Sequence, residues 1–391
     1  MKKKILFVLN QMGAGGIAKS LSNLLYHLEK YKDDYDIDLF LLRKDGCYIK
    51  DIPEYVNVYE AKGVLKLFGA SQKDTEKFGK LTTFNRFITA CWTKAFSNYI
   101  PLKIGCNQNK LQKEYDAAIS FTHTQNSHDM AAGSVEFVLN SVKAKKKFCV
   151  IHGDVVIENL LNKSNVKKFK KFDKIFSVSQ DCSNQVKKVC PDLAEKSDFL
   201  YNTQRNDIIK EKANEFQVDL GEQLNLVMIS RLEKEKGHLR FLPIIKKLKE
   251  EGFSFKLNII GDGSKKIEIE QYVLKNQMDK YVRILGYQAN PYPFFKKAEL
   301  SILVSYNEAA PMIYNESQLL GTPVFTTRTL SADEMVGDNG FVCDNTDDGI
   351  YSGLKHILSH PELIKEKQSK LKTFEYNNDQ IVKKLLLSIE E

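Results

Sequence analysis

The sequence predicts an α/β protein made of two doubly wound domains, each with a parallel sheet covered by helices. Three observations lead to this prediction. Short apolar runs alternate with amphipathic segments along most of the chain. Several apolar runs end in a glycine turn and are followed by a helical pattern, which is typical of βαβ units. The length of 391 residues is more than one core of this kind usually holds.

The first series of elements opens with an apolar run at 2–10 and a glycine turn at 13–16. Leucines at helical spacing follow, and then a second apolar run at 34–42. Residues 62–114 mix charged and aromatic residues without a clean period, and we expect them to be helical. Further strands are expected at 115–121 and 146–151, where buried-strand composition returns.

A second series begins near residue 224. Its expected strands lie at 224–230, 255–260, 282–287, 300–305 and 322–327, with amphipathic segments between them. Short connections join strands and helices throughout, which favours a second parallel sheet. The polar segment 201–223 is the expected junction. The sequence therefore predicts a first domain at 1–200 and a second at 201–375.

The positive charge is confined to the first half. Residues 1–200 carry 32 Lys and Arg against 22 Asp and Glu, a net charge of +10, so −2 remains for the second half of a chain with +8 overall. Two runs, 143–147 and 163–174, hold many of these lysines. Nucleic acid, an anionic membrane or a phosphorylated ligand would each suit this charge, and so would solvated helix faces. Nucleic acid is the least favoured, because no aromatic-basic recognition module is visible.

Seven cysteines without a C-x-x-C pair indicate a reduced, cytoplasmic protein with no zinc site. The apolar run near the N-terminus ends at Asn10, which is too short for a signal peptide or a membrane span. We therefore expect any membrane contact to be peripheral.

Two motifs of the first half fall at the expected carboxyl ends of strands. Gly15 and Gly16 lie in the first glycine turn, where they would let a ligand approach the backbone, although a tight turn alone would also explain them. His152 follows the strand at 146–151 and would point into a ligand crevice. A loop histidine bonded to the backbone is the plainer interpretation.

In the second half, Arg231 and Lys236 follow a strand and are five positions apart. Paired cations at such a position suit a diphosphate. The alternative is surface charge paired with Glu233 and Glu235.

The stretch "EAAPMIYNE" contains Glu308 and Glu316, eight positions apart. Pro311 suits the first turn of a helix, so Glu308 is expected in a loop and Glu316 more than a turn inside the helix. The N–H groups of the helix start would attract a phosphate between the two carboxylates. Acids that merely favour a helix N-terminus are an equally good explanation from spacing alone.

Taken together, these residues resemble the retaining glycosyltransferases of the GT-B fold that carry a Glu-x7-Glu signature, the glycosyltransferase family 4-like group. "SRLEKEKG" is similar to a motif of that family, and "EAAPM" and "IHGD" resemble enzymes of bacterial capsule and exopolysaccharide synthesis. The signature residues here are Ser305, Glu308, Pro311, Glu316, Gly321, Pro323 and Val324.

The resemblance implies two Rossmann-like domains facing across a cleft, with a last helix at about 376–391 that returns to the first domain. It implies catalytic roles for His152 and Glu308 and a donor-closing role for Gly15 and Gly16. It also implies which residues bind each part of the donor. The diphosphate would be bound by Arg231, Lys236, Pro311, Met312 and Ile313. The ribose would be bound by Glu316, and the base by Gly286 and Tyr287.

We therefore expect transfer of a hexosyl group from a nucleoside-diphosphate sugar, most of all a UDP-sugar, to a glycan or lipid-linked acceptor. No metal or other cofactor is expected. The enzyme would work in the cytoplasm, peripherally on the inner face of the cell membrane, through its basic half. A sugar-nucleotide epimerase of the same fold and a non-catalytic binding subunit of polysaccharide assembly are the alternatives.

Overall fold

The computed structural model describes residues 2–69 and 79–391. Contacts divide the chain into two compact units, Met1–Thr203 with Asn377–Glu391, and Gln204–Tyr376. The sequence suggested divisions after residues 200 and 375. The two parts are called unit 1 and unit 2, and each is described by itself.

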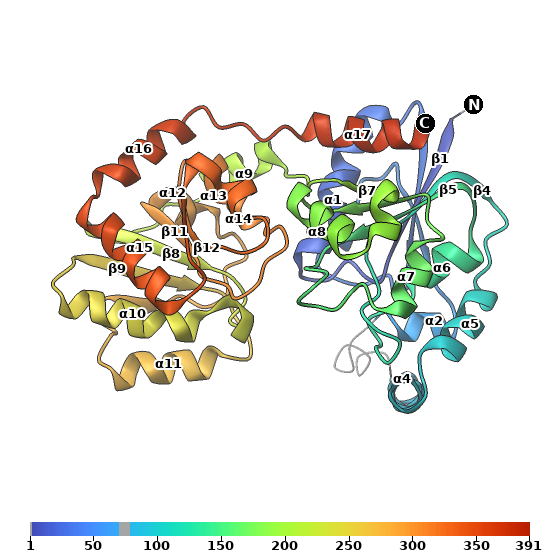
Figure 1. Ribbon diagram of the computed structural model, residues 1–391, viewed down its shortest axis with the longest axis horizontal. Helices are drawn as coiled ribbons and strands as arrows, with labels where there is room; N and C mark the ends of the chain where they lie inside the picture. The colour runs from blue at the N-terminus through green and yellow to red at the C-terminus, as the bar shows by residue number, and fades with distance from the viewer. Residues whose placement is uncertain (1, 70–78) are drawn as a thin grey trace. The chain divides into compact units, whose positions relative to one another are not determined.

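Unit 1 is built on a seven-stranded sheet with the order β3-β2-β1-β4-β5-β6-β7, in which every pairing is parallel (Figure 1). Its helices cover the sheet as in other doubly wound folds. The strands are β1 Lys3–Leu9, β2 Tyr35–Leu41, β3 Asn57–Glu60, β4 Glu114–Ser120, β5 Lys143–Ile151, β6 Lys174–Ser177 and β7 Ser197–Phe199. The helices are α1 Gly16–Leu28, α2 Val64–Leu67, α4 Lys80–Ala95, α5 Tyr99–Gln108, α6 Ser134–Ser141, α7 Lys163–Phe169, α8 Gln180–Val189 and α17 Asn378–Glu390.

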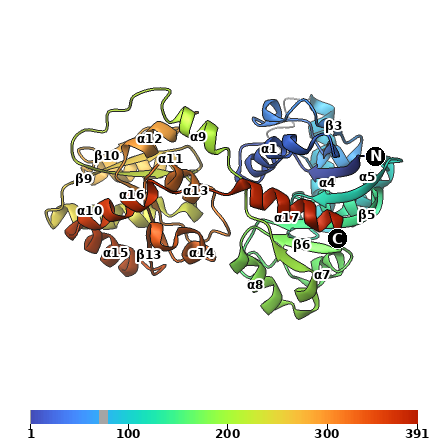
Figure 2. The ribbon, with the colours of Figure 1, turned by 90° about the horizontal axis from the view of Figure 1, so that it is seen from above.

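The central strands of unit 1 are buried on both faces, which explains their continuous apolar runs. Residues 5–8 of β1 are fully buried, and so are most residues at the carboxyl end of β5. The C-terminal helix α17 packs beside α1 (Figure 2). Ion pairs and hydrogen bonds hold it there, among them Lys30 to Asp379 at 2.8 Å and Lys384 to Asp198 at 2.7 Å.

Residues 62–114, which lack a clean sequence period, contain α2, α4 and α5. The prediction that this segment is helical is confirmed for these parts, while residues 70–78 lie outside the described residues. The missing period has a physical cause, because α4 buries polar side chains and exposes apolar ones.

Unit 2 has a six-stranded parallel sheet with the order β10-β9-β8-β11-β12-β13. Its core is the apolar cluster between this sheet and the helices on its faces. The strands are β8 Leu224–Ile229, β9 Phe255–Ile260, β10 Val282–Ile284, β11 Leu300–Leu303, β12 Val324–Thr327 and β13 Phe341–Cys343. The helices are α9 Asn206–Lys212, α10 His238–Glu250, α11 Lys266–Lys275, α12 Tyr292–Lys297, α13 Ile313–Leu319, α14 Ala332–Val336, α15 Asp347–Ser359 and α16 Glu362–Leu371.

All seven cysteines are free thiols. Within the described ranges, no helix has both the length and the apolar character that crossing a bilayer requires.

One glycine controls how the loop after β8 turns into α10. Gly237 precedes the helix with φ of 77°, a left-handed conformation that side chains disfavour. A Cβ on this residue would lie 2.1 Å from the carbonyl oxygen of Val304, at the end of β11. Glycine is therefore required twice at this position, by backbone conformation and by the close approach of two loops.

We predict that Gly237→Ala destabilises unit 2 well beyond the cost of a positive φ, because the new methyl group must displace the backbone of Val304. Gly252→Ala is the matched control: Gly252 has φ of 92°, and a Cβ on it would meet nothing within 4 Å. Urea unfolding should show a loss of about 1 kcal/mol for the control and roughly 2–4 kcal/mol for Gly237→Ala. Equal losses in both variants would contradict the close approach.

Candidate functional site

The strand order of unit 2 reverses between β8 and β11, and ligands of open parallel sheets bind at the carboxyl ends of strands beside such a reversal. Two predicted motifs begin at this place. The loop after β8 carries Arg231 and leads into the short 3-10 helix η4, Lys234–Lys236. The loop after β11 carries Ser305 and Glu308. The topology therefore brings together residues that are far apart in the sequence.

Lys236 and Glu308 form the central ion pair of this site. The Lys236 Nζ and Glu308 Oε1 atoms are 2.5 Å apart, and the side chains are only 16% and 11% exposed. The Ser305 hydroxyl donates a second hydrogen bond to the same carboxylate oxygen, at 2.7 Å. The Thr327 hydroxyl donates to the carbonyl of Ser305 at 2.7 Å and so fixes that loop against β12. The carboxylate of Glu308 is thus held by two donors.

The loops after β8 and β11 are also tied together through their backbones. The N–H of Tyr306 donates to the carbonyl of Glu235 at 2.9 Å. The guanidinium of Arg240 lies 4.3 Å from the centre of the Tyr306 ring, and Asn345 donates to the Tyr306 carbonyl at 3.0 Å. These contacts therefore hold in place the two loops that carry Lys236 and Glu308.

Arg231 is placed differently from Lys236. Its side chain is 66% exposed and pairs with Glu235 at 3.2 Å. Arg231 therefore forms a surface pair with Glu235, whereas Lys236 pairs with Glu308 and not with a neighbouring acid. Glu233 accepts hydrogen bonds from the backbone and hydroxyl of Ser264, and these bonds lower the pKa of Glu233.

The helix after Pro311 starts later than the sequence suggested. α13 spans Ile313–Leu319 with Met312 at its N-cap, so Pro311 precedes the cap. Glu316 consequently lies in the first turn, and the prediction that it lies more than a turn inside the helix is wrong. The side chain of Glu316 is nonetheless buried, with an exposed fraction of 6%. The buried amide of Gln204 donates to the Met312 carbonyl at 3.2 Å and so holds the start of α13.

Gly286 and Tyr287 follow β10, beside the glycine turn after β9. Gly286 has φ of 67°, its carbonyl accepts a hydrogen bond from Gly261 at 2.9 Å, and a Cβ on it would meet nothing within 4 Å. The Tyr287 side chain is 73% exposed. This edge of unit 2 therefore offers an open backbone position beside an accessible aromatic ring.

In unit 1, strand order reverses between β1 and β4, and the glycine turn after β1 lies there. Gly16 begins α1 and Gly15 is its N-cap. Among the residues that the structure describes, a Cβ on Gly15 or Gly16 would meet nothing within 4 Å, so packing against them does not demand glycine at these positions.

His152 follows β5 and lies in a cluster that the sequence did not reveal. Its backbone N–H donates to Nδ1 of His123 at 3.2 Å, and Nε2 of His123 is 4.0 Å from a carboxylate oxygen of Glu158. His152 also bonds to the backbone of Phe121. Within the described residues its buried Nε2 has no hydrogen-bond partner. Nε2 of His152 is therefore a buried ring nitrogen that is open to a ligand.

Burial keeps the two histidines of this cluster uncharged. It lowers the pKa of His152 to about 3, helped by the neighbouring His123, and the pKa of His123 to about 4. Burial also raises the pKa of Glu158. Both imidazoles are therefore neutral at pH 7. His123 and Glu158 were missed because neither stands in a motif; the one available signal was that His123 closely follows a buried strand.

We predict that the stability of unit 1 falls as the pH is lowered from about 6.5 towards 4. Above the ordinary histidine pKa neither state is protonated, and below it the unfolded chain takes up protons that the folded chain refuses. Each of the two histidines should cost roughly 2 kcal/mol at pH 5. Urea unfolding at pH 7 and pH 5 measures the difference, which His152→Asn should reduce.

The matched control is His356→Gln, which replaces an exposed histidine on α15 of unit 2 and should leave the difference unchanged. If His152→Asn and the native chain lose the same stability between the two pH values, the buried neutral state of His152 is wrong.

Parts of this chain are similar in sequence to known proteins. Residues 210–383 match the family Glycosyl transferases group 1. A Campylobacter jejuni protein named as an N-acetylgalactosaminyltransferase acting on a diphospho-undecaprenol-linked sugar is 29% identical over 182 residues, 46% of this chain and 48% of that protein. An amylovoran biosynthesis glycosyltransferase of Erwinia amylovora is 25% identical over 146 residues, 37% of this chain and 41% of that protein. The chain thus spans about half the length of the curated relatives that it matches.

Solved structures extend the likeness of fold to the whole chain. The Anabaena protein HepE, in complex with UDP and glucose, has a TM-score of 0.68 at 16% identity, with 100% of both chains covered. Sucrose-phosphate synthase of Thermosynechococcus elongatus has a TM-score of 0.68 at 13% identity, covering 100% of this chain and 98% of the other. The predicted GT-B fold is confirmed. The match to the family Glycosyl transferases group 1 covers residues 210–383 of this chain.

Proposed function

We propose that this chain is a retaining glycosyltransferase that moves a hexosyl group from a nucleoside-diphosphate sugar, above all a UDP-sugar, to a glycan or lipid-linked acceptor. The observation that carries the proposal is the half-buried Lys236–Glu308 pair, with Ser305 beside it, at the strand reversal of a glycosyl transferases group 1 domain. Such a domain needs cations for a leaving diphosphate and a carboxylate for sugar hydroxyls, and this pair supplies both.

Lys236 offsets the charge of the leaving diphosphate in this proposal. An ammonium group has three N–H donors, and Glu308 takes one of them, so two remain for phosphate oxygens. Arg231 adds a second cation, because its exposed pair with Glu235 is weak and a phosphate can replace it. The backbone N–H groups of Met312 and Ile313 contribute further donors beside Pro311. Positive charge thus comes from the chain itself, and we propose no resident metal or cofactor.

The remaining groups of unit 2 suit the rest of a nucleotide-sugar. The buried carboxylate of Glu316 can accept hydrogen bonds from ribose hydroxyls. The base can stack near the exposed ring of Tyr287 and approach the backbone at Gly286. Glu308 keeps its other oxygen for a hydroxyl of the transferred sugar.

His152 acts as a hydrogen-bond acceptor in this proposal and not as a general base. A group with a pKa of about 3 is a poor proton acceptor at neutral pH. Its bare Nε2 can nevertheless accept a hydrogen bond from a sugar hydroxyl, and this bond would satisfy a buried polar atom. Gly15 and Gly16, which packing leaves open, would allow the backbone to approach the donor.

A lipid-linked glycan is the acceptor that we propose. The Campylobacter relative is named for a diphospho-undecaprenol-linked acceptor, and the Erwinia relative for an exopolysaccharide. By analogy, the chain would extend a lipid-linked glycan for capsule or another cell-surface polysaccharide, working peripherally at the cytoplasmic face of the membrane.

We predict that UDP raises the melting temperature of the protein and that Lys236→Met weakens UDP binding about 10- to 100-fold, since two charged hydrogen bonds to phosphate are lost. Isothermal titration with UDP, ADP and GDP measures affinity and base preference together. Lys234→Ala, a change of another lysine in the same short helix, is the control and should leave the affinity unchanged.

The double variant Lys236→Met with Glu308→Gln separates two causes of such a loss. If Lys236 itself binds phosphate, the double variant should bind UDP as weakly as Lys236→Met. Full recovery of affinity would mean instead that the stranded Glu308 carboxylate repelled the ligand, and the role of Lys236 would then be wrong.

We predict that Glu308→Gln slows transfer about 100-fold or more without weakening UDP binding, because it removes the carboxylate and frees Lys236 for phosphate. Release of UDP from UDP-sugars in the presence of a lipid-linked acceptor measures the rate, and proton NMR of the product tests retention. Unchanged transfer would overturn the site assignment. Isomerisation of the sugar without acceptor and without UDP release would favour the epimerase alternative.

A further inference from the structure

Helix α4 of unit 1 is turned the opposite way to an ordinary surface helix, whose apolar stripe faces the core. Its exposed side is apolar: Leu81, Phe84, Phe87, Ile88 and Trp92 are all exposed. Its buried positions are polar ones, Arg86 and Thr93. The helix therefore presents to solvent the residues that normally make a core.

The exposed apolar surface continues into α5. The rings of Trp92 and Phe96 lie 4.7 Å apart, and Tyr99, Ile100 and Ile104 are exposed beyond them. The opposite side of α5 is buried in unit 1, so α5 is a packed helix and not a loose one. We name the exposed set the α4–α5 face; it consists of Leu81, Phe84, Phe87, Ile88, Trp92, Phe96, Tyr99, Ile100 and Ile104.

This concentration is not the usual scatter of apolar side chains on a surface. Nineteen large apolar side chains are exposed among the described residues, and nine of them fall within residues 81–104. Isolated exposed apolar residues need no explanation, but a contiguous group marks an interaction site.

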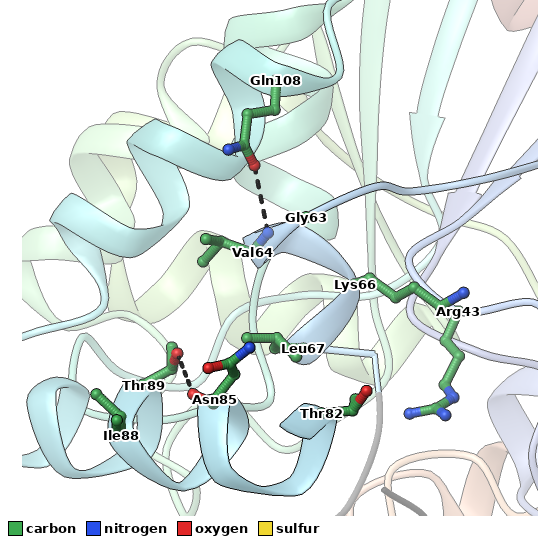
Figure 3. A pocket seen from close by; sticks show the side chains of 10 residues that line it. All are labelled: Arg43, Gly63, Val64, Lys66, Leu67, Thr82, Asn85, Ile88, Thr89 and Gln108. Carbon is green, nitrogen blue, oxygen red and sulfur yellow. Dashed lines mark hydrogen bonds between the residues drawn. The ribbon is translucent and has the colours of Figure 1, made fainter. Parts of the chain in front are cut away.

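The inward side of α4 has its own polar surroundings, which fix this orientation. Thr82, Asn85 and Thr89 line a cavity of about 640 Å³ between α4, α2 and the end of α5 (Figure 3). Arg43 and Lys66 line the same cavity, and so do the apolar residues Val64, Leu67 and Ile88. Turning α4 over would bury its large aromatic side chains beside Arg43 and Lys66 and would expose Thr93. The outward position of the α4–α5 face is thus a consequence of the fold.

The segment that carries the face has charge of one sign. Residues 79–113 contain no Asp or Glu and six basic residues: Lys80, Arg86, Lys94, Lys103, Lys110 and Lys113. Lys80, Lys94 and Lys103 are exposed on α4 and α5 themselves. Apolar and aromatic side chains bordered by lysines are the pattern of helices that lie in the interface of an anionic bilayer.

The lysine runs noted in the sequence are less suited to this task. Lys145 pairs with Asp116 at 2.7 Å, Lys168 with Glu136 at 2.8 Å, and Lys170 with Asp192 at 2.6 Å. Much of the charge of both runs is therefore neutralised within unit 1.

We propose that the α4–α5 face inserts into the interface of an anionic lipid bilayer and anchors unit 1 there. A second copy of the chain is a poorer occupant, because two such faces would bring lysines of like charge together. An anchored unit 1 would bring the enzyme to a membrane that holds the proposed lipid-linked acceptor, and only this consequence rests on the proposed function. Vesicle binding itself is measured without any sugar transfer.

The protein carries its own probe for this test, since Trp92 is the one tryptophan in the sequence. On titration with vesicles of phosphatidylcholine and phosphatidylglycerol, its emission should shift to shorter wavelength, and lipids brominated on the acyl chain should quench it. Vesicles of phosphatidylcholine alone should bind at least about tenfold more weakly, and salt should weaken binding to the anionic ones.

Phe84→Ser with Phe87→Ser should weaken binding to anionic vesicles about tenfold or more, because two large apolar side chains no longer enter the bilayer. The matched control is Ile267→Ser with Leu274→Ser, two equally exposed apolar residues on α11 of unit 2, which should bind like the native chain. Unchanged melting temperatures exclude a folding defect in either pair.

Three results would overturn the proposal: no spectral shift with anionic vesicles, equal losses in both variant pairs, or a shift that follows protein concentration without lipid and coincides with dimer formation. The affinity of the Phe84→Ser, Phe87→Ser variant for UDP tests the proposed function separately. This variant should bind UDP like the native chain, because neither residue belongs to the donor site.

Discussion

Parallel strand pairing is the constraint on which the rest of this structure depends. Parallel strands all run in the same direction, so every strand in the sheet ends at the same edge. The chain must therefore cross back over a face of the sheet to begin the next strand. Where the order of strands reverses, the loops diverge and leave room for a ligand. In unit 2 the reversal brings Lys236 to Glu308 across 72 positions of sequence. In unit 1 the same geometry places Gly15 and Gly16 at the end of β1 beside the end of β4.

The two edges use burial in opposite ways. At the edge of unit 2, Lys236 and Glu308 compensate each other's charge, and Ser305 adds a hydrogen bond. At the edge of unit 1, burial lowers the pKa of His123 and His152, so both remain neutral although a Glu158 carboxylate oxygen lies 4.0 Å from His123. One edge thus holds a compensated ion pair, and the other holds two uncharged imidazole rings.

The folded structure shows which charged side chains are paired and which apolar side chains are exposed, and the sequence alone does not. The sequence showed an excess of lysine in the first half. Ion pairs such as Lys145 with Asp116 and Lys168 with Glu136 hold several of these lysines, although they leave the net charge unchanged. The least periodic segment of the sequence turned out to contain the α4–α5 face, because α4 buries polar groups such as Arg86 and Thr93. Sequence patterns assume that apolar residues face inward, and where the fold breaks that rule they lose their signal.

The sequence by itself determined the two parallel sheets, most of their strands and the motif residues at the strand ends, because apolar runs and glycine turns are local signals. Only the tertiary structure decided which of those residues meet. In the fold, Lys236 pairs with Glu308, while Arg231 lies at the surface. Glu316 lies in the first turn of α13, and His123 lies beside His152. Side-chain pairing and desolvation depend on groups distant in the chain, which no local pattern contains.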